Sequence, residues 1–128
     1  EPAIIHRDIK PSNVIITNYN RAVLLDFNAA KYFSAQSKED TVLLGTHGYA
    51  APEQYGFGAS SPQTDIYSLG VLLKEMLASI HNPSKNLEII ADTCTQLDPS
   101  KRYQSVARLR DELRSAFQAQ VPVQKPSK

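Results

Sequence analysis

The stretch from residue 65 to residue 80 constrains the fold most, because its apolar side chains leave almost no polar face. Six of them follow the spacing of one helical face and three lie on the other side: Ile66, Leu69, Leu73, Met76, Leu77 and Ile80, then Tyr67, Val71 and Leu72. A helix that is apolar nearly all round is normally buried. Polar residues such as Lys74 and Glu75 break the run, which keeps it short of the ~18 apolar residues of a membrane span. We therefore expect a buried helix over 65–80 and no membrane contact within this segment.

Two more helices are expected after this one. A cap and first turn at Asn82 and Pro83 are expected to precede an apolar face made of Leu87, Ile90, Ala91, Cys94 and Leu97. The next helix is predicted to start at Ser105 and to carry one apolar stripe, made of Val106, Leu109, Leu113 and Phe117. From Val121 onward, prolines and polar residues predict a disordered tail over 121–128.

Two short β-branched, apolar runs, at 14–16 and 22–25, lie on either side of a segment that contains two asparagines. Because asparagine suits a turn, this pattern predicts a short β-hairpin. The following segment, from residue 26 to about Gly45, has neither a helical nor a strand period and is expected to be a mobile loop. The predicted fold class is therefore mainly α with a short β-hairpin.

Composition excludes several classes of protein. Among 128 residues, 14 Lys and Arg stand against 13 Asp and Glu, and this net charge of +1 provides no basic surface for nucleic acid. Hydrophobic residues at 41% and charged residues at 21% are typical of a chain that folds around one core. One cysteine and three scattered histidines give neither a disulfide framework nor a zinc-site spacing, so a reduced, cytoplasmic location is expected. The chain starts at Glu1 without a signal peptide, which is typical of a segment cut from a longer protein.

The chemistry is concentrated in residues 6–13, His-Arg-Asp-Ile-Lys-Pro-Ser-Asn, directly before the first strand of the predicted hairpin. Asp8 and Asn13 are five residues apart, the spacing at which a catalytic-loop aspartate receives a hydroxyl proton and the asparagine binds a metal. Asp26 follows the second strand, and because the hairpin returns the chain, it can arrive near Asn13. An amide oxygen and a carboxylate oxygen would then meet one hard cation, which predicts Mg²⁺.

These residues belong to a series of motifs that resembles the lower lobe, or C-lobe, of a protein kinase, specifically the bacterial members of the eukaryotic-like Ser/Thr kinase family. The motifs follow the order of that family: HRDIKPSN at 6–13, DFN at 26–28, GTHGYAAPEQ at 45–54, DIYSLG at 65–70, and Asp98-Pro99 followed by Arg102. The resemblance implies that residues 1–120 are part of a two-lobed α+β kinase domain, from the catalytic loop to the last C-lobe helix. It also implies transfer of the γ-phosphoryl group of ATP to a Ser or Thr hydroxyl of a protein substrate.

The resemblance implies a catalytic role for four residues of these motifs. Asp8 is the expected catalytic base, Lys10 the expected contact to the transferring phosphate of ATP, and Asn13 and Asp26 the expected Mg²⁺ ligands. Each of these residues alone could equally be an ordinary polar residue of a turn. Their combination at these spacings favours the catalytic interpretation.

Further roles implied by the resemblance concern regulation and architecture. Thr46, just before the GYAAPE turn, fits specificity for Ser and Thr, and Arg7 would pair with a phosphate on the activation segment. Asp65 would bind the backbone of the catalytic loop. The alternatives are an exposed arginine without a special role and a helix cap. The candidate phosphorylation sites are Thr41, Ser37 and Ser34, and the candidate buried ion pair is Glu53 with Arg102.

Departures from the family pattern limit what the segment can do by itself. The glycine-rich loop, strand lysine and helix glutamate of the upper lobe, or N-lobe, would all lie before Glu1. The segment is therefore expected to be inactive without this missing N-lobe, which is its expected partner. The C-lobe helices that normally precede the catalytic loop would be missing too, which predicts exposed apolar surface and self-association through it. The alternative function is a non-catalytic, kinase-like scaffold or binding module.

One substitution and one short connection also depart from the pattern. Asn28 replaces the glycine that usually follows Asp-Phe, and we expect it to adopt a left-handed backbone, which asparagine tolerates. Residues 79–85 are too few for the substrate-docking helix that the family commonly has there.

Overall fold

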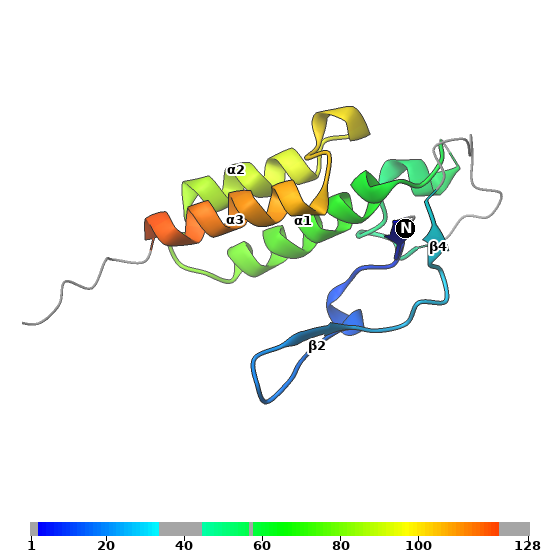
Figure 1. Cartoon of the computed structure of the whole chain (residues 1–128). Helices are drawn as coiled ribbons and strands as arrows, with labels where there is room; N and C mark the ends of the chain where they lie inside the picture. Colours follow the sequence, from blue (N-terminus) through cyan, green and yellow to red (C-terminus); the bar gives the residue numbers. More distant parts are fainter. Residues whose placement is uncertain (1–2, 34–44, 57, 121–128) are drawn as a thin grey trace, which may run out of the picture.

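Three helices form the largest part of the regular secondary structure among the described residues, which are 3–33, 45–56 and 58–120 in this computed structural model. They are α1 (Pro62–Ala78), α2 (Lys85–Cys94) and α3 (Val106–Gln120). Figure 1 shows that α1 and α3 run in the same direction and that α2 runs in the opposite one. No helix in the described part of the chain is long and apolar enough to cross a membrane.

The core lies between the three helices. Its buried members are Ile66, Leu77, Leu87, Ile90, Ala91, Cys94, Leu109 and Ala116, and Leu69, Leu73, Tyr103 and Leu113 pack against them. Helices α1 and α2 approach each other closely at Gly70, where a Cβ atom would lie 2.4 Å from Cβ of Cys94. Glycine is required there by the helix contact, since no larger side chain fits.

Helix α1 starts at Pro62 and not at residue 65, as the apolar spacing alone predicted. Proline suits the first helical position because its missing N–H would have no partner there. Thr64 Oγ1 accepts a hydrogen bond from the N–H of Ser61 at 2.9 Å, which holds the first turn closed. The first residues of the helix are polar and add nothing to the apolar pattern. The start predicted from that pattern is therefore three residues too late.

The far end of α1 is less buried than the sequence predicts. The helix ends at Ala78, two residues before the expected end, and Ser79 Oγ donates a hydrogen bond to the carbonyl of Met76 at 2.8 Å. Met76 and Ile80 are 58% and 52% exposed. The expectation of a helix buried all round is therefore wrong in this structure, because α2 and α3 cover only one side of it.

Helix α2 begins at Lys85, and its cap is Ser84 instead of the predicted Asn82 and Pro83 pair. Ser84 Oγ accepts a hydrogen bond from the N–H of Leu87 at 3.4 Å. Asn82 has a φ of 56°, in the left-handed region that asparagine tolerates, and it turns the chain between α1 and α2. The prediction is wrong because an asparagine beside a proline has the same local pattern in a turn as in a cap.

Helix α3 begins at Val106, directly after Ser105, whose Oγ accepts a hydrogen bond from the N–H of Arg108 at 3.0 Å. The helix thus starts one residue after the predicted position, and Ser105 bonds the backbone of its first turn. Leu97, in contrast, is not on the apolar face of α2. That helix ends at Cys94, and Leu97 lies beyond its end and is 75% exposed.

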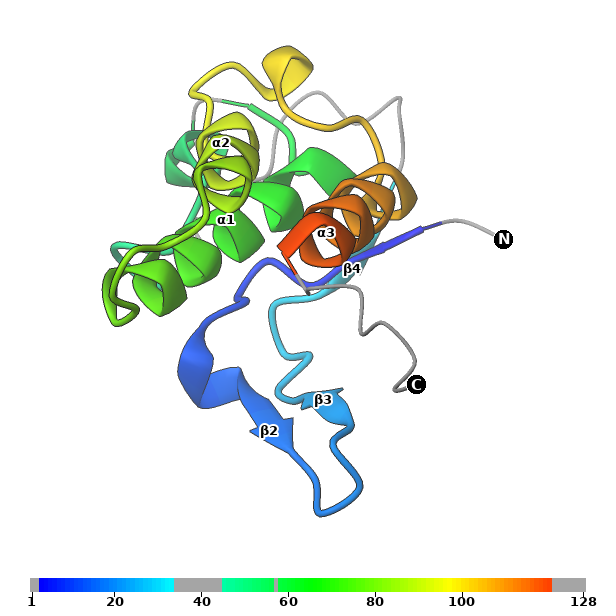
Figure 2. The same ribbon diagram turned by 90° about the vertical axis from the view of Figure 1, so that its left-hand side faces the viewer.

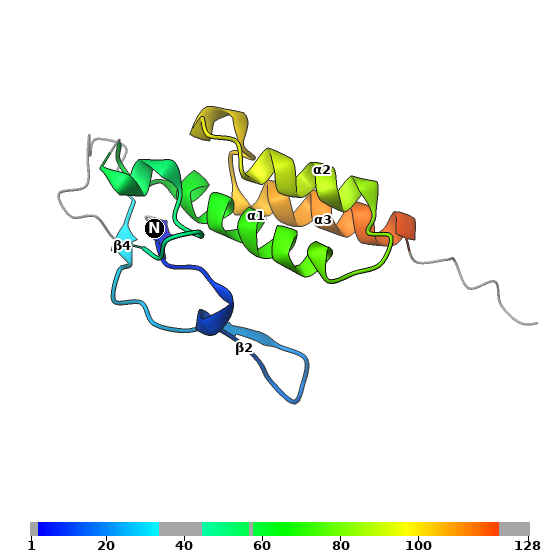
Figure 3. The ribbon, with the colours of Figure 1, turned by 180° about the vertical axis from the view of Figure 1, so that it is seen from behind.

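Two small antiparallel sheets lie beside the helices. Strands β2 (Val14–Ile16) and β3 (Ala22–Leu24) form the predicted hairpin, with Ile15 opposite Val23. Strands β1 (Ile4–Ile5) and β4 (Lys31–Tyr32) form a second sheet, which the sequence did not predict, and β4 lies in the segment expected to be a loop. Figures 2 and 3 show the hairpin extending away from the helices.

An apolar face of α1 is left open within the described residues. A cavity of about 430 Å³ is lined by Ile9, Val14, Ala22, Val23, Leu24, Asp65, Leu69, Leu72 and Val106. A second cavity of about 230 Å³ is lined by Leu69, Leu72, Leu73, Met76, Cys94, Leu109, Leu113 and Phe117. Because the two cavities share Leu69 and Leu72, they form one apolar surface between the hairpin and the helices.

Candidate active site

Asp65, in the first turn of α1, holds the backbone of the loop that carries the motif at 6–13. Its Oδ2 accepts the N–H of His6 at 2.7 Å, and its Oδ1 accepts the N–H of Arg7 at 2.8 Å. Burial raises the pKa of the Asp65 carboxyl, while the two backbone hydrogen bonds act in the opposite direction. Both carboxylate oxygens therefore serve this loop, in a helix position that the sequence alone could equally assign to a cap.

Arg7 is buried, with 9% of its surface exposed, and its backbone has a φ of 72°. Its Nε donates a hydrogen bond to the carbonyl of Ala29 at 2.5 Å, which ties the loop to the segment after Asp-Phe-Asn. The interpretation as a merely exposed arginine does not fit this burial. The candidate phosphorylation sites, Thr41, Ser37 and Ser34, lie outside the described residues.

Asp8, Lys10 and Thr46 form one polar cluster. Thr46 Oγ1 donates to Asp8 Oδ1 at 2.7 Å, and Lys10 Nζ donates to Thr46 Oγ1 at 2.8 Å. Lys10 Nζ also lies 3.8 Å from Asp8 Oδ2. A carboxylate thus lies beside a hydroxyl and an ammonium group, although Thr46 is far from the loop in sequence. This combination can accept a proton from a hydroxyl and stabilise negative charge next to it.

Asn13 connects this cluster to the hairpin. Its Nδ2 donates to the backbone carbonyl of Asp8 at 2.8 Å and lies 3.4 Å from Asp8 Oδ2. The backbone carbonyl of Asn13 accepts a hydrogen bond from the N–H of Leu25 at 2.8 Å. This bond brings the next residue, Asp26, toward Asn13. The hairpin thus returns the chain to the loop as the sequence predicts.

The Asp26 backbone, and not that of Asn28, adopts the left-handed conformation. Asp26 has a φ of 57°, and its Oδ1 accepts the N–H of Asn28 at 3.2 Å. The expectation that Asn28 would be left-handed is therefore wrong. An aspartate reaches this region because its short side chain bonds the backbone two residues ahead.

The donors at this position suit a hard divalent cation. Asn13 uses its Nδ2 on Asp8, so its Oδ1 is the side-chain atom that remains for a metal, and Asp26 is exposed with a carboxylate. Mg²⁺ is often held by one or two protein oxygens together with substrate phosphates and water. Among the described residues, no cluster of three or more His, Cys, Asp or Glu side chains could hold a metal by itself. By their chemistry, the Asn13 amide oxygen and the Asp26 carboxylate are the residues that could hold Mg²⁺.

His6 is a packed residue of the loop. Its Nδ1 accepts the N–H of Asp8 at 3.1 Å, which leaves Nε2 to donate to the carbonyl of Leu25 at 2.8 Å. The ring packs edge-on against Phe27, with centroids 4.8 Å apart. Both ring nitrogens are engaged with backbone groups, so His6 supports the loop instead of exchanging protons with a substrate.

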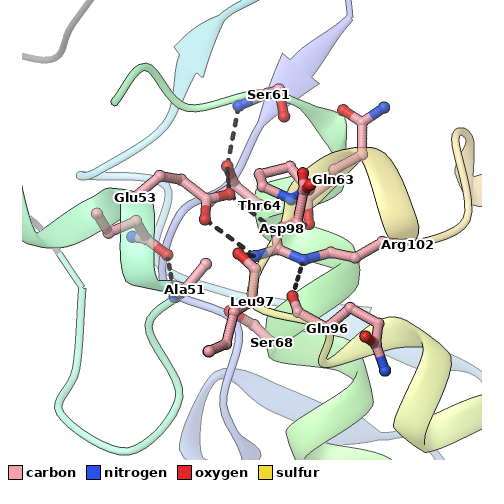
Figure 4. Close-up of polar contacts among 12 residues, drawn as sticks. Ala51, Glu53, Ser61, Gln63, Thr64, Ser68, Gln96, Leu97, Asp98 and Arg102 are labelled. Carbon is pink, nitrogen blue, oxygen red and sulfur yellow. Dashed lines mark hydrogen bonds and ion pairs between the residues drawn. The ribbon is translucent and has the colours of Figure 1, made fainter. Parts of the chain in front are cut away.

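Glu53 and Arg102 form a buried ion pair, drawn in Figure 4. Arg102 donates from its two terminal nitrogens to the two carboxylate oxygens at 2.8 and 3.0 Å. Thr64 Oγ1 donates to Glu53 Oε2 at 2.8 Å, and Arg102 Nε donates to the carbonyl of Gln96 at 2.8 Å. The Arg102 guanidinium also lies over the ring of Tyr67, 4.9 Å from its centroid. The pair thus fastens the segment around Glu53 to the start of α1 and to the loop before α3.

Two polar contacts of the GTHGYAAPEQ motif were not predicted from the sequence. Gln54 donates to the carbonyl of Arg7, and Tyr49 Oη donates to Glu75 Oε1 at 2.5 Å. The hydrogen bond to Glu75 raises the pKa of Tyr49. Tyr49 and Gln54 both lie in the GTHGYAAPEQ motif. Their partners are distant in the sequence, so no local pattern could predict these contacts.

A profile of the family described as "Protein kinase domain" matches residues 1–116. This chain belongs to the protein kinase family. Three similar proteins are serine/threonine-protein kinase PknL of Mycobacterium tuberculosis, lectin-domain containing receptor kinase VI.3 and LRR receptor-like serine/threonine-protein kinase FEI 2, the last two of Arabidopsis thaliana. They are 41%, 39% and 44% identical to it over 81, 98 and 78 residues, which is 62%, 76% and 60% of the chain.

This protein kinase segment spans only 20%, 14% and 13% of the length of these three relatives. Its mainly helical fold with two small sheets is a segment of a protein kinase domain. The relatives that carry "serine/threonine" in their names are Ser/Thr protein kinases.

Proposed function

We propose that this chain is the C-lobe part of a bacterial-type Ser/Thr protein kinase that transfers the γ-phosphoryl group of ATP to a protein Ser or Thr hydroxyl. The observation that carries the proposal is the cluster in which Asp8 accepts a hydrogen bond from the Thr46 hydroxyl beside the Lys10 ammonium group. Asn13 lies at the edge of this cluster, next to the turn that carries Asp26. The family membership supports the assignment of phosphoryl transfer to this cluster.

In the proposed reaction, the Asp8 carboxylate orients the substrate hydroxyl and receives its proton. The hydroxyl oxygen forms a bond to the γ-phosphorus as the bond from that phosphorus to the β-phosphate oxygen breaks, and ADP leaves. Lys10 places a positive charge 3.8 Å from Asp8 Oδ2, where it can stabilise negative charge on the transferring phosphoryl group. Asn13 and Asp26 would hold Mg²⁺, which neutralises phosphate charge when bound.

The nucleotide requires more than this chain. In the family, a glycine-rich loop and a strand lysine contact the phosphates from the N-lobe, and neither lies in residues 1–128. We call the chain joined to a kinase N-lobe the completed kinase. The completed kinase is expected to phosphorylate proteins, whereas the 128-residue chain is expected to bind MgATP weakly and to be inactive.

The test incubates the completed kinase with γ-labelled ATP, Mg²⁺ and a mixture of protein substrates, and then identifies the labelled amino acids. Label on serine and threonine is the expected result. Label on tyrosine would contradict the proposed specificity, and a wild-type protein without transfer activity would favour the non-catalytic scaffold. Micromolar MgATP affinity of the 128-residue chain in titration calorimetry would contradict the need for the N-lobe.

A further inference from the structure

Gln54 is a buried amide whose two ends bind two different parts of the backbone. It lies in the short 3₁₀ helix Pro52–Tyr55 and is 4% exposed. Its Oε1 accepts the N–H of Ala51 at 3.0 Å, and its Nε2 donates to the carbonyl of Arg7 at 2.6 Å, 47 residues earlier in the chain. Only one orientation of the amide serves both partners, since a flip would place oxygen against the Arg7 carbonyl.

The Arg7 carbonyl belongs to the peptide group that carries the N–H of Asp8. That N–H donates to His6 Nδ1 at 3.1 Å, so the peptide plane before Asp8 is held at one end by His6 and at the other by Gln54. Because a peptide group is planar, releasing one end lets the whole plane rotate. The plane also follows Arg7, whose backbone φ is 72°. Residues other than glycine rarely adopt this left-handed conformation, and they do so where the surrounding structure holds them in it.

Gln54 also contacts the chain segment that carries Thr46. A Cβ atom on Gly45, the residue before Thr46, would lie 2.7 Å from Gln54 Nε2 and 3.2 Å from the Arg7 carbonyl oxygen. The Gln54 side chain therefore lies beside the residue preceding Asp8 and the residue preceding Thr46. It is placed to fix the relative position of the two residues that share the 2.7 Å hydrogen bond at the centre of the site.

The residue before Gln54 is held by buried polar contacts. This residue, Glu53, is held by the buried guanidinium of Arg102 and by the hydroxyl of Thr64. Glu53 thus joins the short helix to α1 and to Arg102, and Gln54 joins it to the catalytic loop.

We propose that Gln54 is a positioning residue for phosphoryl transfer, which sets the direction of the Asp8 carboxylate through the Arg7 carbonyl. The proposal rests on the proposed kinase function. Gln54 does not touch the substrate, so its loss is expected to act on the rate of the chemical step and not on the binding of ATP.

The test compares three variants of the completed kinase. Gln54→Glu keeps the acceptor for Ala51 and removes the donor to Arg7, whereas Gln54→Leu removes both. Gln63→Glu is the matched control, because it makes the same chemical change at an amide whose side chain contacts Gln104 on the surface. Steady-state and single-turnover kinetics are measured with a Ser/Thr peptide, and the melting temperature is recorded for each variant.

Both Gln54 variants are expected to lose about 10- to 100-fold in kcat, since a displacement of about 1 Å at a reacting group has effects of that size. KM for ATP is expected to stay within about twofold, because no contact to nucleotide is lost. The control is expected to match the wild type in both parameters. A Gln54→Glu variant with the kcat of the wild type would overturn the role of Gln54 alone. An inactive wild type would overturn the proposed function and with it any catalytic role of Gln54.

A measurement on the wild type keeps the proposal testable if both Gln54 variants fail to fold. The side-chain amide protons of Gln54 are expected to exchange with solvent much more slowly than those of Gln63, because the Gln54 amide is buried and bonded to the Arg7 carbonyl. Exchange as fast as at Gln63 would overturn the contact on which the positioning role depends.

Discussion

Glu53 and Arg102 are 49 residues apart in the sequence and form a two-pronged ion pair that is almost free of solvent, with side chains 8% and 0% exposed. A buried charge of this kind needs its partner, because neither side chain can be solvated by water if the other is removed. The pair therefore holds two distant parts of the chain in one position.

Glu53→Gln in the completed kinase is expected to lower the free energy of unfolding by about 3–5 kcal/mol, the usual cost of breaking a buried pair by removal of one charge. Urea unfolding provides the measurement. The control is Glu112→Gln, which changes a pair with Arg108 whose side chains are partly open to solvent, and it is expected to cost less than about 1 kcal/mol. Equal losses in the two variants would mean that the Glu53 pair does not behave as a buried one.

Gly70→Ala is expected to destabilise the protein although alanine favours helices. The new Cβ atom would lie 2.4 Å from Cβ of Cys94 and 2.8 Å from Cγ2 of Thr95, so α1 and α2 would have to separate. Overpacking of this kind costs about 1–3 kcal/mol, which exceeds the gain of up to about 1 kcal/mol from helix propensity. Gly58→Ala is the control, because its Cβ would meet nothing closer than 3.6 Å. A Gly70→Ala variant as stable as the Gly58→Ala variant in thermal unfolding would contradict the close approach of the helices.

The buried Cys94 thiol is expected to lower the free energy of unfolding as the pH rises in the alkaline range. Burial raises the pKa of this thiol to about 12, whereas the pKa of a cysteine thiol in an unfolded chain is about 8.5. Between these two values the unfolded state loses a proton that the folded state keeps, so stability from this group falls as pH rises above about 8.5. The wild type is expected to lose about 1 kcal/mol more than Cys94→Ala when urea unfolding is compared at about pH 7 and about pH 9.5. Equal losses in the two proteins would contradict the burial of the thiol.

The sequence predicted the helices and the hairpin well where a repeated pattern exists. The apolar spacing around Leu69 extends over several helical turns, and the β-branched run at 14–16 is matched by a second run at 22–25 across a turn, so both patterns are readable. Strands β1 and β4 are two residues long and exist only because they pair with each other, and no period can be read from two residues. The cap of α2 was predicted at Asn82 and is Ser84, because asparagine followed by proline is common both in turns and in helix caps.

The site was predictable to the extent that it is encoded within one loop. The spacing of Asp8 and Asn13 indicates their proximity, and the hairpin brings Asp26 toward them. The contacts of Thr46 and Gln54 join residues 38 and 47 positions apart, and only the packing of the whole chain determines them. The catalytic roles of these residues stay predictions that kinetics can test.

Asp8→Asn in the completed kinase is expected to lower turnover by about 10²- to 10⁴-fold, the usual contribution of a general base. The amide keeps the size of the side chain and an oxygen that can accept the Thr46 hydroxyl, but it cannot take the proton of the substrate. ATP affinity is expected to stay nearly unchanged. Single-turnover phosphoryl transfer and a separate titration with nucleotide measure the two effects independently.

Asp26→Asn is expected to differ from Asp8→Asn in kind. It removes a charged oxygen ligand of the proposed Mg²⁺ site, so it should weaken the binding of MgATP as well as turnover. Raising the Mg²⁺ concentration is expected to restore part of the activity of Asp26→Asn and none of that of Asp8→Asn, because only the first variant loses metal affinity. If instead Asp8→Asn transferred phosphate at the rate of the wild type, this carboxylate would not be the base, and the loop would fit a scaffold that only resembles an enzyme.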